Sequence, residues 1–302
     1  MKLQGLHHVT MITADAQANV DFYADLLGLR LVKKTVNFDA PDAYHLYFGD
    51  ESGSPGSLLT WFEFPDAARG RAGAGMIHTL QLAVAGPAAL DFWAQRLESH
   101  RADSTRTDAN IRFADPDGLA LELVTGGEDA PLRAGHPQIP AEHALMGVLG
   151  ARAYQRTEQD RTLLTETLGF TASGTDDYVL EGEQRRFRWS YDRAAEAGTQ
   201  GAGTVHHIAW HSRDEDHTAW QSEVARAGRQ VTPVIDRDYF LSIYFRMPGG
   251  VLFEIATTSP GFAVDEDPEH LGEELKLPRQ HEHLRSQLEQ ILTPVSNPRA
   301  RV

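Results

Sequence analysis

Gly5-Leu-His-His-Val-Thr10 and Val205-His-His-Ile-Ala209 are two copies of one pattern, a histidine pair set among apolar and β-branched residues. Each copy predicts a short β-strand. After the first copy a helical pattern begins near Asp15, and Gly28 stands where a helix C-cap glycine belongs. The strands expected next cover Leu29–Val36, Ala43–Phe48 and Leu58–Phe62, so that the whole unit is β-α-β-β-β.

The same unit recurs, and its four copies start near residues 6, 76, 147 and 205. A period of roughly 60 to 70 residues is longer than a solenoid repeat and suits paired βαβββ modules. Further helices are expected over Pro87–Leu97, Glu158–Leu168 and Asp214–Ala227. Further strands are expected over Ile77–Val84, Ile111–Phe113, Leu119–Val124, Tyr178–Leu180, Arg186–Tyr191, Tyr239–Arg246 and Val251–Ala256. We therefore predict an α+β fold in which four modules form two domains with mixed curved sheets.

The segment Gly126–Pro140 contains three prolines and three glycines, which is typical of a linker. We expect an N-terminal domain over 1–125 from modules one and two, and a linker over 126–145. A C-terminal domain from modules three and four should cover 146–260. The tail 261–302 should contain a helix over Glu282–Leu292.

Composition excludes several classes of protein. The 302 residues include 28 Lys and Arg against 43 Asp and Glu, a formal net charge of −15, which argues against duplex nucleic acid and anionic membrane surfaces as partners. With 41% apolar residues the chain can fill a core, and no apolar run approaches the length of a membrane span. We expect a cytoplasmic protein. There is no cysteine, so any metal must be held by nitrogen and oxygen.

Side-chain register predicts a metal site. His207 lies on the first strand of the fourth module and Glu254 on its last strand. These two strands should lie side by side in one curved sheet, and His8 holds the matching position of the first module. Two imidazoles and one carboxylate suit non-heme Fe(II), with Mn(II) as the second choice. Calcium and magnesium prefer oxygen ligands and are less suited.

The second and third modules should form a mirror-image site without a working metal centre. Module two offers His78 and Glu122, which we align with His207 and Glu254. Module three places Leu149 at the third ligand position. Two ligands of three bind a metal poorly, so we expect one working site, between modules one and four.

In these features the chain resembles the vicinal oxygen chelate superfamily of glyoxalases and extradiol dioxygenases. It most resembles ring-cleaving dioxygenases that act on hydroquinones and chlorinated hydroquinones. Besides the two histidine stretches, the resemblance rests on Ala43-Tyr-His-Leu-Tyr-Phe48, Gly53-Ser-Pro-Gly56, Tyr244-Phe-Arg-Met-Pro-Gly-Gly-Val-Leu-Phe-Glu254 and Gly261-Phe-Ala-Val-Asp-Glu-Asp267. It implies two vicinal-oxygen-chelate (glyoxalase-like) domains and a non-heme iron, extradiol-type enzyme. The iron ligands that it implies are again His8, His207 and Glu254.

The resemblance also implies roles for five further residues. Tyr244, His206 and Arg237 are implied as catalytic, and His7 and Thr10 as substrate-binding. The substrates implied are a small aromatic diol and O2. Neighbouring strand residues point to opposite faces, so the first histidine of each pair can reach the cup of the second only through a bulge or a strongly twisted strand end.

Two alternatives remain open. A glyoxalase-like isomerase or lyase normally draws a carboxylate from each of two modules, and Thr60-Trp61 stands where the second one is expected. A non-catalytic protein that binds aromatic compounds needs no metal triplet. The ring substituents, the choice between hydroquinone and catechol, and the state of a possible homo-oligomer are not determined by the sequence.

Overall fold

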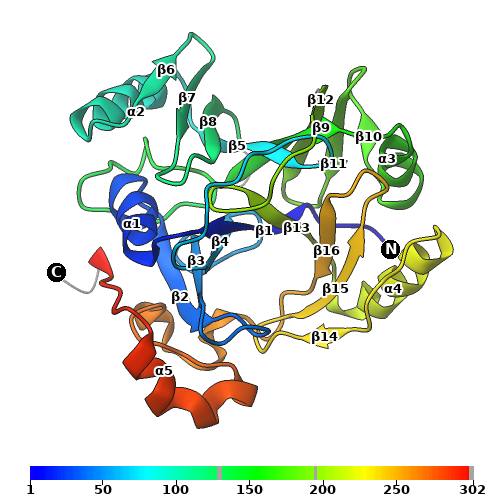
Figure 1. Cartoon of the computed structure of the whole chain (residues 1–302). Coiled ribbons are helices and arrows are strands. Elements are labelled where there is room, and N and C mark those ends of the chain that lie inside the picture. Colours follow the sequence, from blue (N-terminus) through cyan, green and yellow to red (C-terminus); the bar gives the residue numbers. More distant parts are fainter. Residues whose placement is uncertain (128–130, 194–195, 299–302) are drawn as a thin grey trace.

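The computed structural model describes residues 1–127, 131–193 and 196–298. Its strands form two curved eight-stranded sheets that mix parallel and antiparallel pairs, with helices on their outer faces (Figure 1). The predicted α+β fold of four βαβββ modules is confirmed. Each sheet joins two modules through their first strands, which run antiparallel at its centre.

The first sheet combines modules one and four in the order β14-β15-β16-β13-β1-β4-β3-β2. Its strands from module one are β1 (Leu6–Thr13), β2 (Arg30–Val36), β3 (Tyr44–Gly49) and β4 (Leu58–Glu63). Its strands from module four are β13 (Val205–His211), β14 (Ile235–Asp236), β15 (Leu241–Arg246) and β16 (Leu252–Ala256).

The second sheet combines modules two and three in the order β10-β11-β12-β9-β5-β8-β7-β6. Module two supplies β5 (Ile77–Val84), β6 (Ser104–Arg106), β7 (Asn110–Ala114) and β8 (Ala120–Thr125). Module three supplies β9 (Val148–Gln155), β10 (Thr171–Ala172), β11 (Asp177–Glu181) and β12 (Arg186–Arg193). Each sheet takes one module from each half of the chain, so the two predicted domains do not correspond to the two sheets. Residues 128–130 of the predicted linker 126–145 lie outside the described residues.

The helices lie close to their predicted places. Asp15 caps the first one by accepting a hydrogen bond from the Ala18 amide, and Gly28, with φ of +72°, follows its end. The helices, with η for 3-10 and π segments, are α1 (Ala16–Val20), η1 (Asp21–Leu26), α2 (Pro87–Ser99), α3 (Gln159–Thr162), η2 (Leu163–Thr167), η3 (Asp214–Asp216) and α4 (His217–Arg226).

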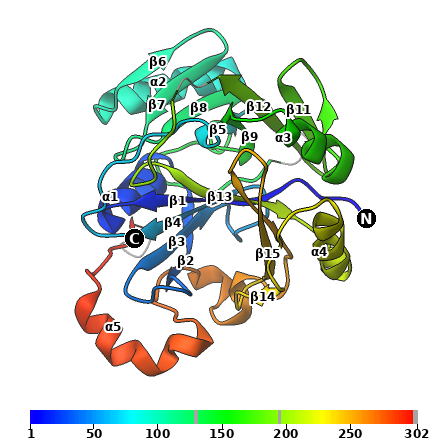
Figure 2. The ribbon, with the colours of Figure 1, turned by 45° about the vertical axis from the view of Figure 1, so that its right-hand side comes forward.

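The C-terminal tail lies along the outer edge of the first sheet, beside β2 (Figure 2). Lys33 of β2 is fully buried and makes ion pairs with Asp265 and Glu266 of the tail. The predicted tail helix is shorter than expected, since a 3-10 segment precedes it. The tail elements are η4 (Phe262–Val264), η5 (Pro268–His270), η6 (Arg279–Leu284) and α5 (Arg285–Ile291).

Candidate active site

The predicted histidine ligands lie on the two central strands of the first sheet. His8 of β1 pairs with Ala209 of β13, and Thr10 pairs with His207. This reciprocal register relates the two histidines by an approximate two-fold axis. On the neighbouring strand β16, Glu254 lies beside Ala209, so its side chain is next to that of His207.

A β-bulge occurs at the first histidine of each pair. The pairing register between β1 and β13 shifts at His7 and again at His206, which breaks the usual alternation of strand faces. As a result, Nδ1 of His7 lies 2.8 Å from Nδ1 of His8, and Nδ1 of His206 lies 2.8 Å from Nδ1 of His207. If a metal ion were bound at Nε2 of His8 or His207, the ring proton would stay on Nδ1. The neighbouring imidazole would then accept a hydrogen bond from that Nδ1–H group.

The three predicted ligand atoms converge on one point. Nε2 of His8 lies 3.3 Å from Nε2 of His207, and the two nitrogens lie 3.3 and 3.0 Å from Oε2 of Glu254. Among the described residues, His8, His207 and Glu254 form a group whose ligand atoms lie close enough together to hold a metal ion. All three are buried, and Glu254 is fully inaccessible.

The donor set fits a divalent metal ion. Oε1 of Glu254 accepts a hydrogen bond from Ser242, whereas the buried Oε2 has no hydrogen bond of good geometry from the described residues and faces only Nε2 of His8 and of His207. Such an unsatisfied oxygen is costly unless a cation lies beside it. Three ligands at right angles and at about 2.1 Å from an ion lie about 3.0 Å from one another, close to the separations observed here.

The protonation states also suit a metal. Burial alone would raise the pKa of Glu254, but the imidazoles of His8 and His207 outweigh it and hold this pKa well below its usual value. Burial lowers the pKa of His207. An ionised carboxylate and a neutral imidazole are the forms that bind divalent ions.

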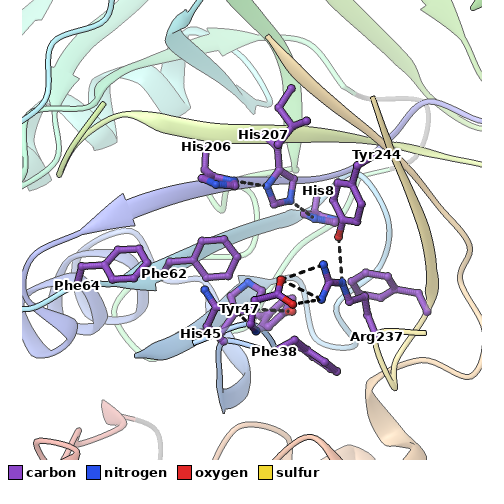
Figure 3. A pocket seen from close by; sticks show the side chains of 14 residues that line it. His8, Phe38, His45, Tyr47, Phe62, Phe64, His206, His207, Arg237 and Tyr244 are labelled. Atoms are coloured by element: carbon purple, nitrogen blue, oxygen red, sulfur yellow. Dashed lines mark hydrogen bonds and ion pairs between the residues drawn. The ribbon is translucent and has the colours of Figure 1, made fainter. Parts of the chain in front are cut away.

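A cavity of about 320 Å³ opens in front of the triad (Figure 3). This volume is at the lower end of the range for small-molecule sites and suits a single substituted ring. Its wall is largely aromatic, with a few polar groups. The described residues that line it are His8, Asn37, Phe38, Asp39, His45, Tyr47, Phe62, Phe64, His206, His207, Arg237, Phe240, Tyr244 and Leu252.

Arg237 and Tyr244 form one polar side of this cavity. Nε of Arg237 donates to the Tyr244 hydroxyl over 3.2 Å, and its terminal nitrogens lie 3.3 to 3.5 Å from the carboxylate of Asp39 (Figure 3). Burial, followed by the charge of Glu254, raises the pKa of Tyr244, so the phenol stays protonated. Because its oxygen accepts from Arg237, its proton is free to be donated into the cavity.

The other predicted site residues are placed differently from one another. His206 lines the cavity, and desolvation with the neighbouring imidazole lowers its pKa to about 4. His7 and Thr10 are not among the described residues that line this cavity. His7 faces a smaller cavity behind Phe240, and Thr10 is fully buried and hydrogen-bonded to Thr60. The substrate contacts expected of His7 and Thr10 stay predictions.

Sequence reasoning missed four polar residues of the cavity wall, Asn37, Asp39, His45 and Tyr47. His45 and Tyr47 lie on β3, at alternate positions of the predicted strand Ala43–Phe48, and both face the cavity. That alternation was the available signal, because residues two apart share a face. Nothing in the local sequence shows that this face meets the triad.

In the second sheet, Thr79 rather than His78 takes the position of His207. Gln81 of β5 lies beside Glu122 of β8, and Thr79 is two residues before Gln81, which is the spacing found in module four. The register shifts at His78, so His78 occupies the bulge position. Our alignment was wrong by one residue because a bulge cannot be read from spacing.

The same correction applies to module three. Gly150 of β9, rather than Leu149, matches His8, because Gly150 pairs with Gln81 and the register shifts at Leu149. The second sheet therefore keeps a single residue of the metal-ligand type at these positions, Glu122. Whether the second sheet binds a metal stays a prediction.

The fold and this site define a protein class. The chain belongs to the Glyoxalase/Bleomycin resistance protein/Dioxygenase superfamily, whose sequence profile matches residues 5–123 and 153–255. Relatives that match along nearly the whole chain have names that indicate a narrower class of protein. It is 42% identical to MhqO of Bacillus subtilis, named as a candidate ring-cleaving dioxygenase, over 97% of each chain. It is 34% identical to the chlorohydroquinone/hydroquinone 1,2-dioxygenase of Sphingobium indicum over 95% of each chain.

Solved structures agree with this assignment. The crystal structure of a candidate dioxygenase from Bacillus subtilis matches with a TM-score of 0.92 and 41% identity, over 98% of both chains. Glyoxalase I from Zea mays matches with a TM-score of 0.60 and 13% identity, over 84% of this chain and 92% of that one. The second likeness concerns the fold alone. In the described ranges, no helix combines the length and apolarity needed to cross a bilayer.

Proposed function

We propose that this protein is an extradiol-type ring-cleaving dioxygenase that uses a non-heme Fe(II), or Mn(II), to insert O2 into a hydroquinone or catechol-like aromatic diol. The observation that carries the proposal is the convergence of His8, His207 and Glu254 at the base of an aromatic-walled cavity. Relatives named as ring-cleaving dioxygenases support it along the whole chain. A ferrous ion bound there would supply the electron transfer that lets O2 react with the ring.

The chain's own residues bind and orient the ring. Phe38, Phe62 and Phe240 offer apolar faces on which an aromatic substrate can stack. The depth of the triad, buried behind them, limits the access of water to the reacting ring. The cavity thereby holds the diol with one oxygen at the ligand cluster.

Polar residues handle charge and protons in this proposal. Tyr244 donates a hydrogen bond from its phenol to a substrate oxygen. Arg237, which is hydrogen-bonded to the Tyr244 hydroxyl, compensates the negative charge that develops on that oxygen. His206 lines the cavity and is the candidate acid–base group. The roles of Tyr244, Arg237 and His206 were predicted from the resemblance, and the geometry supports the first two through their shared hydrogen bond.

The metal analysis and the substrate test belong in one experiment. The protein is purified without oxygen, its metal is quantified, and oxygen consumption is measured against a panel of catechols and hydroquinones. We expect about one iron or manganese ion per chain and oxygen uptake with at least one diol. Nickel or zinc with turnover of a thiol adduct would support the glyoxalase-like alternative, and absence of bound metal would support a non-catalytic binding protein.

Two further expectations are tested separately. Light scattering measures whether several copies of the chain assemble into a homo-oligomer, which the sequence leaves open. Fractionation of the source cells tests the cytoplasmic location that the composition predicts.

A further inference from the structure

The module that contributes His8 brings a second phenol to the cavity. Tyr47 of β3 lies beside Thr60 of β4, as Tyr244 of β15 lies beside Glu254 of β16. The approximate two-fold axis therefore relates Thr60 to Glu254 and Tyr47 to Tyr244. Both tyrosines line the same cavity, from the two different halves of the sheet (Figure 3).

A chain of hydrogen bonds runs behind Tyr47. Its hydroxyl lies 2.9 Å from Nδ1 of His45, and Nε2 of His45 lies 3.0 Å from Oγ1 of Thr60. Oγ1 of Thr60 lies 2.7 Å from Oγ1 of Thr10. All four residues are buried, so every proton of the chain that does not face the cavity needs a protein acceptor.

The buried end of the chain sets its direction. In the described part of the protein the Thr10 hydroxyl has Thr60 as its side-chain partner, and a buried hydroxyl that gave its proton to nothing would lose a hydrogen bond. Thr10 therefore donates to Thr60, and Thr60 donates to Nε2 of His45. Burial, with the nearby His8, lowers the pKa of His45 well below its usual value, so the neutral ring has one proton, on Nδ1.

This direction leaves the phenolic proton of Tyr47 free. Nδ1 of His45 donates to the Tyr47 oxygen, just as Nε of Arg237 donates to the Tyr244 oxygen. Burial, then the neighbouring Tyr244, raises the pKa of Tyr47 well above its usual value, so the phenol keeps its proton. Each tyrosine thus has an N–H group behind it and a proton to donate into the cavity.

Resting on the function proposed above, we propose that Tyr47 is a second catalytic hydrogen-bond donor to the aromatic diol, and that His45 is the positioning residue that aims it. The substrate has two oxygens, and the two phenols line the cavity from the two halves of the sheet. A donor fixed in advance stabilises charge that develops on a ring oxygen without reorganising. The chain Thr10–Thr60–His45 supplies that fixation.

The test replaces Tyr47 in the metal-loaded full chain and uses 1,4-dihydroxybenzene as the probe. Two quantities are measured, the dissociation constant without oxygen and kcat/KM from oxygen uptake. We expect Tyr47→Phe to weaken binding and to lower kcat/KM about 10- to 100-fold, with unchanged metal content. Tyr44→Phe is the matched control, because Tyr44 lies on the same strand and is buried outside the cavity wall.

His45 is tested by rescue. His45→Leu removes the N–H group behind Tyr47 and should reproduce its loss, whereas His45→Asn keeps a donor near Nδ1 and should recover most of the binding. In the double variant of Tyr47→Phe with His45→Leu, the losses should not add, because both act through one hydroxyl. A merely structural His45 would instead lower the melting temperature in both variants and give additive losses.

The outcomes separate this inference from the proposed function. Wild-type turnover with unchanged binding and turnover in Tyr47→Phe would overturn the role of Tyr47 alone. If the wild-type protein binds the probe but consumes no oxygen, and Tyr47→Phe weakens that binding, the dioxygenase function is overturned. Tyr47 then remains a hydrogen-bond donor to a bound ligand. A metal-loaded wild-type protein that binds neither 1,4-dihydroxybenzene nor catechol would overturn both.

Discussion

The two sheets share one topology and one strand register, yet they present different chemistry at equivalent positions. In the first sheet, His8, His207 and Glu254 converge with an unsatisfied carboxylate oxygen between two imidazoles. The four equivalent positions are His8, Thr60, His207 and Glu254 in the first sheet, and Gly150, Ser190, Thr79 and Glu122 in the second.

Glu122 shows why one carboxylate in register does not make a metal site. Its two oxygens accept hydrogen bonds from Gln81, Asn110 and Arg112. Protein donors, one of them cationic, thus fill the positions around the carboxylate that an ion would need. Glu254 differs in leaving one oxygen to face only the imidazoles.

Gly150 shows how the second sheet excludes a ligand on the facing strand. A Cβ atom there would lie 2.7 Å from the side chain of Gln81 and 2.8 Å from the backbone oxygen of Arg188. Real Cβ atoms do not approach other atoms so closely, so the chain of β12 closes over the place that His8 occupies in the first sheet. The two sheets therefore differ at these positions through hydrogen-bond donors around the carboxylate and through close packing, and not through strand register. These two features distinguish the candidate metal site of the first sheet from the equivalent positions of the second.

The largest expected effect comes from Glu254, and the equivalent exchange at Glu122 is its control. Glu254→Gln removes the anionic ligand, so bound metal should fall by more than the roughly 10- to 100-fold that loss of an outer hydrogen-bond partner costs, and turnover should vanish. Glu122→Gln is the matched control and should leave metal content and turnover unchanged. Metal analysis with oxygen uptake measures both, and equal losses in the two variants would abolish the distinction between the cups.

A smaller loss is expected from Arg237, the cation of the first cup. Arg237→Gln removes the charge behind Tyr244, so kcat/KM should fall about 10-fold or more while metal content stays the same. Arg279→Gln is the control, since Arg279 is exposed and pairs with Asp236 and Asp238 outside the cavity. Steady-state oxygen uptake with a diol is measured for both variants. Equal rates would show that Arg237 has no role in turnover.

The repeat and the triad could be predicted because both depend on local patterns. The histidine pairs and the glycines that end helices are visible within a few residues, and each of His8, His207 and Glu254 keeps a fixed place in its module. The short edge strands β6, β10 and β14 were missed, since segments of two or three residues carry no periodic signal.

The bulges at His78 and Leu149 could not be predicted, and they caused the errors in the alignment of modules two and three. A bulge adds one residue to one strand of a pair, so it changes which side chain faces the cup without changing the sequence spacing. Tyr47 and His45 were not predicted as site residues for a related reason. Their importance arises from neighbours on β1 and β4, which only the folded sheet brings beside them.

The packing around Gly150 gives a stability prediction. Gly150→Ala places a Cβ against backbone and should reduce the free energy of unfolding by about 1–3 kcal/mol. Gly86→Ala is the control, because a Cβ at Gly86 meets nothing within 4 Å and its backbone is extended. Urea unfolding measures both, and equal stabilities would show that the second sheet has room for a ligand after all.

The smallest effect is expected at His78, which occupies the bulge of β5 in the second sheet. Its Nε2 lies 2.9 Å from Asp192, and its ring stacks on Tyr154. Arg152 also binds Asp192, so His78→Ala leaves that carboxylate paired and should cost only about 0.5–1 kcal/mol of stability. Metal content and turnover should be unchanged, because Thr79 rather than His78 holds the ligand position. A clear loss of bound metal in His78→Ala would mean that the second cup takes part in metal binding, and the contrast between the two sheets would then be one of degree.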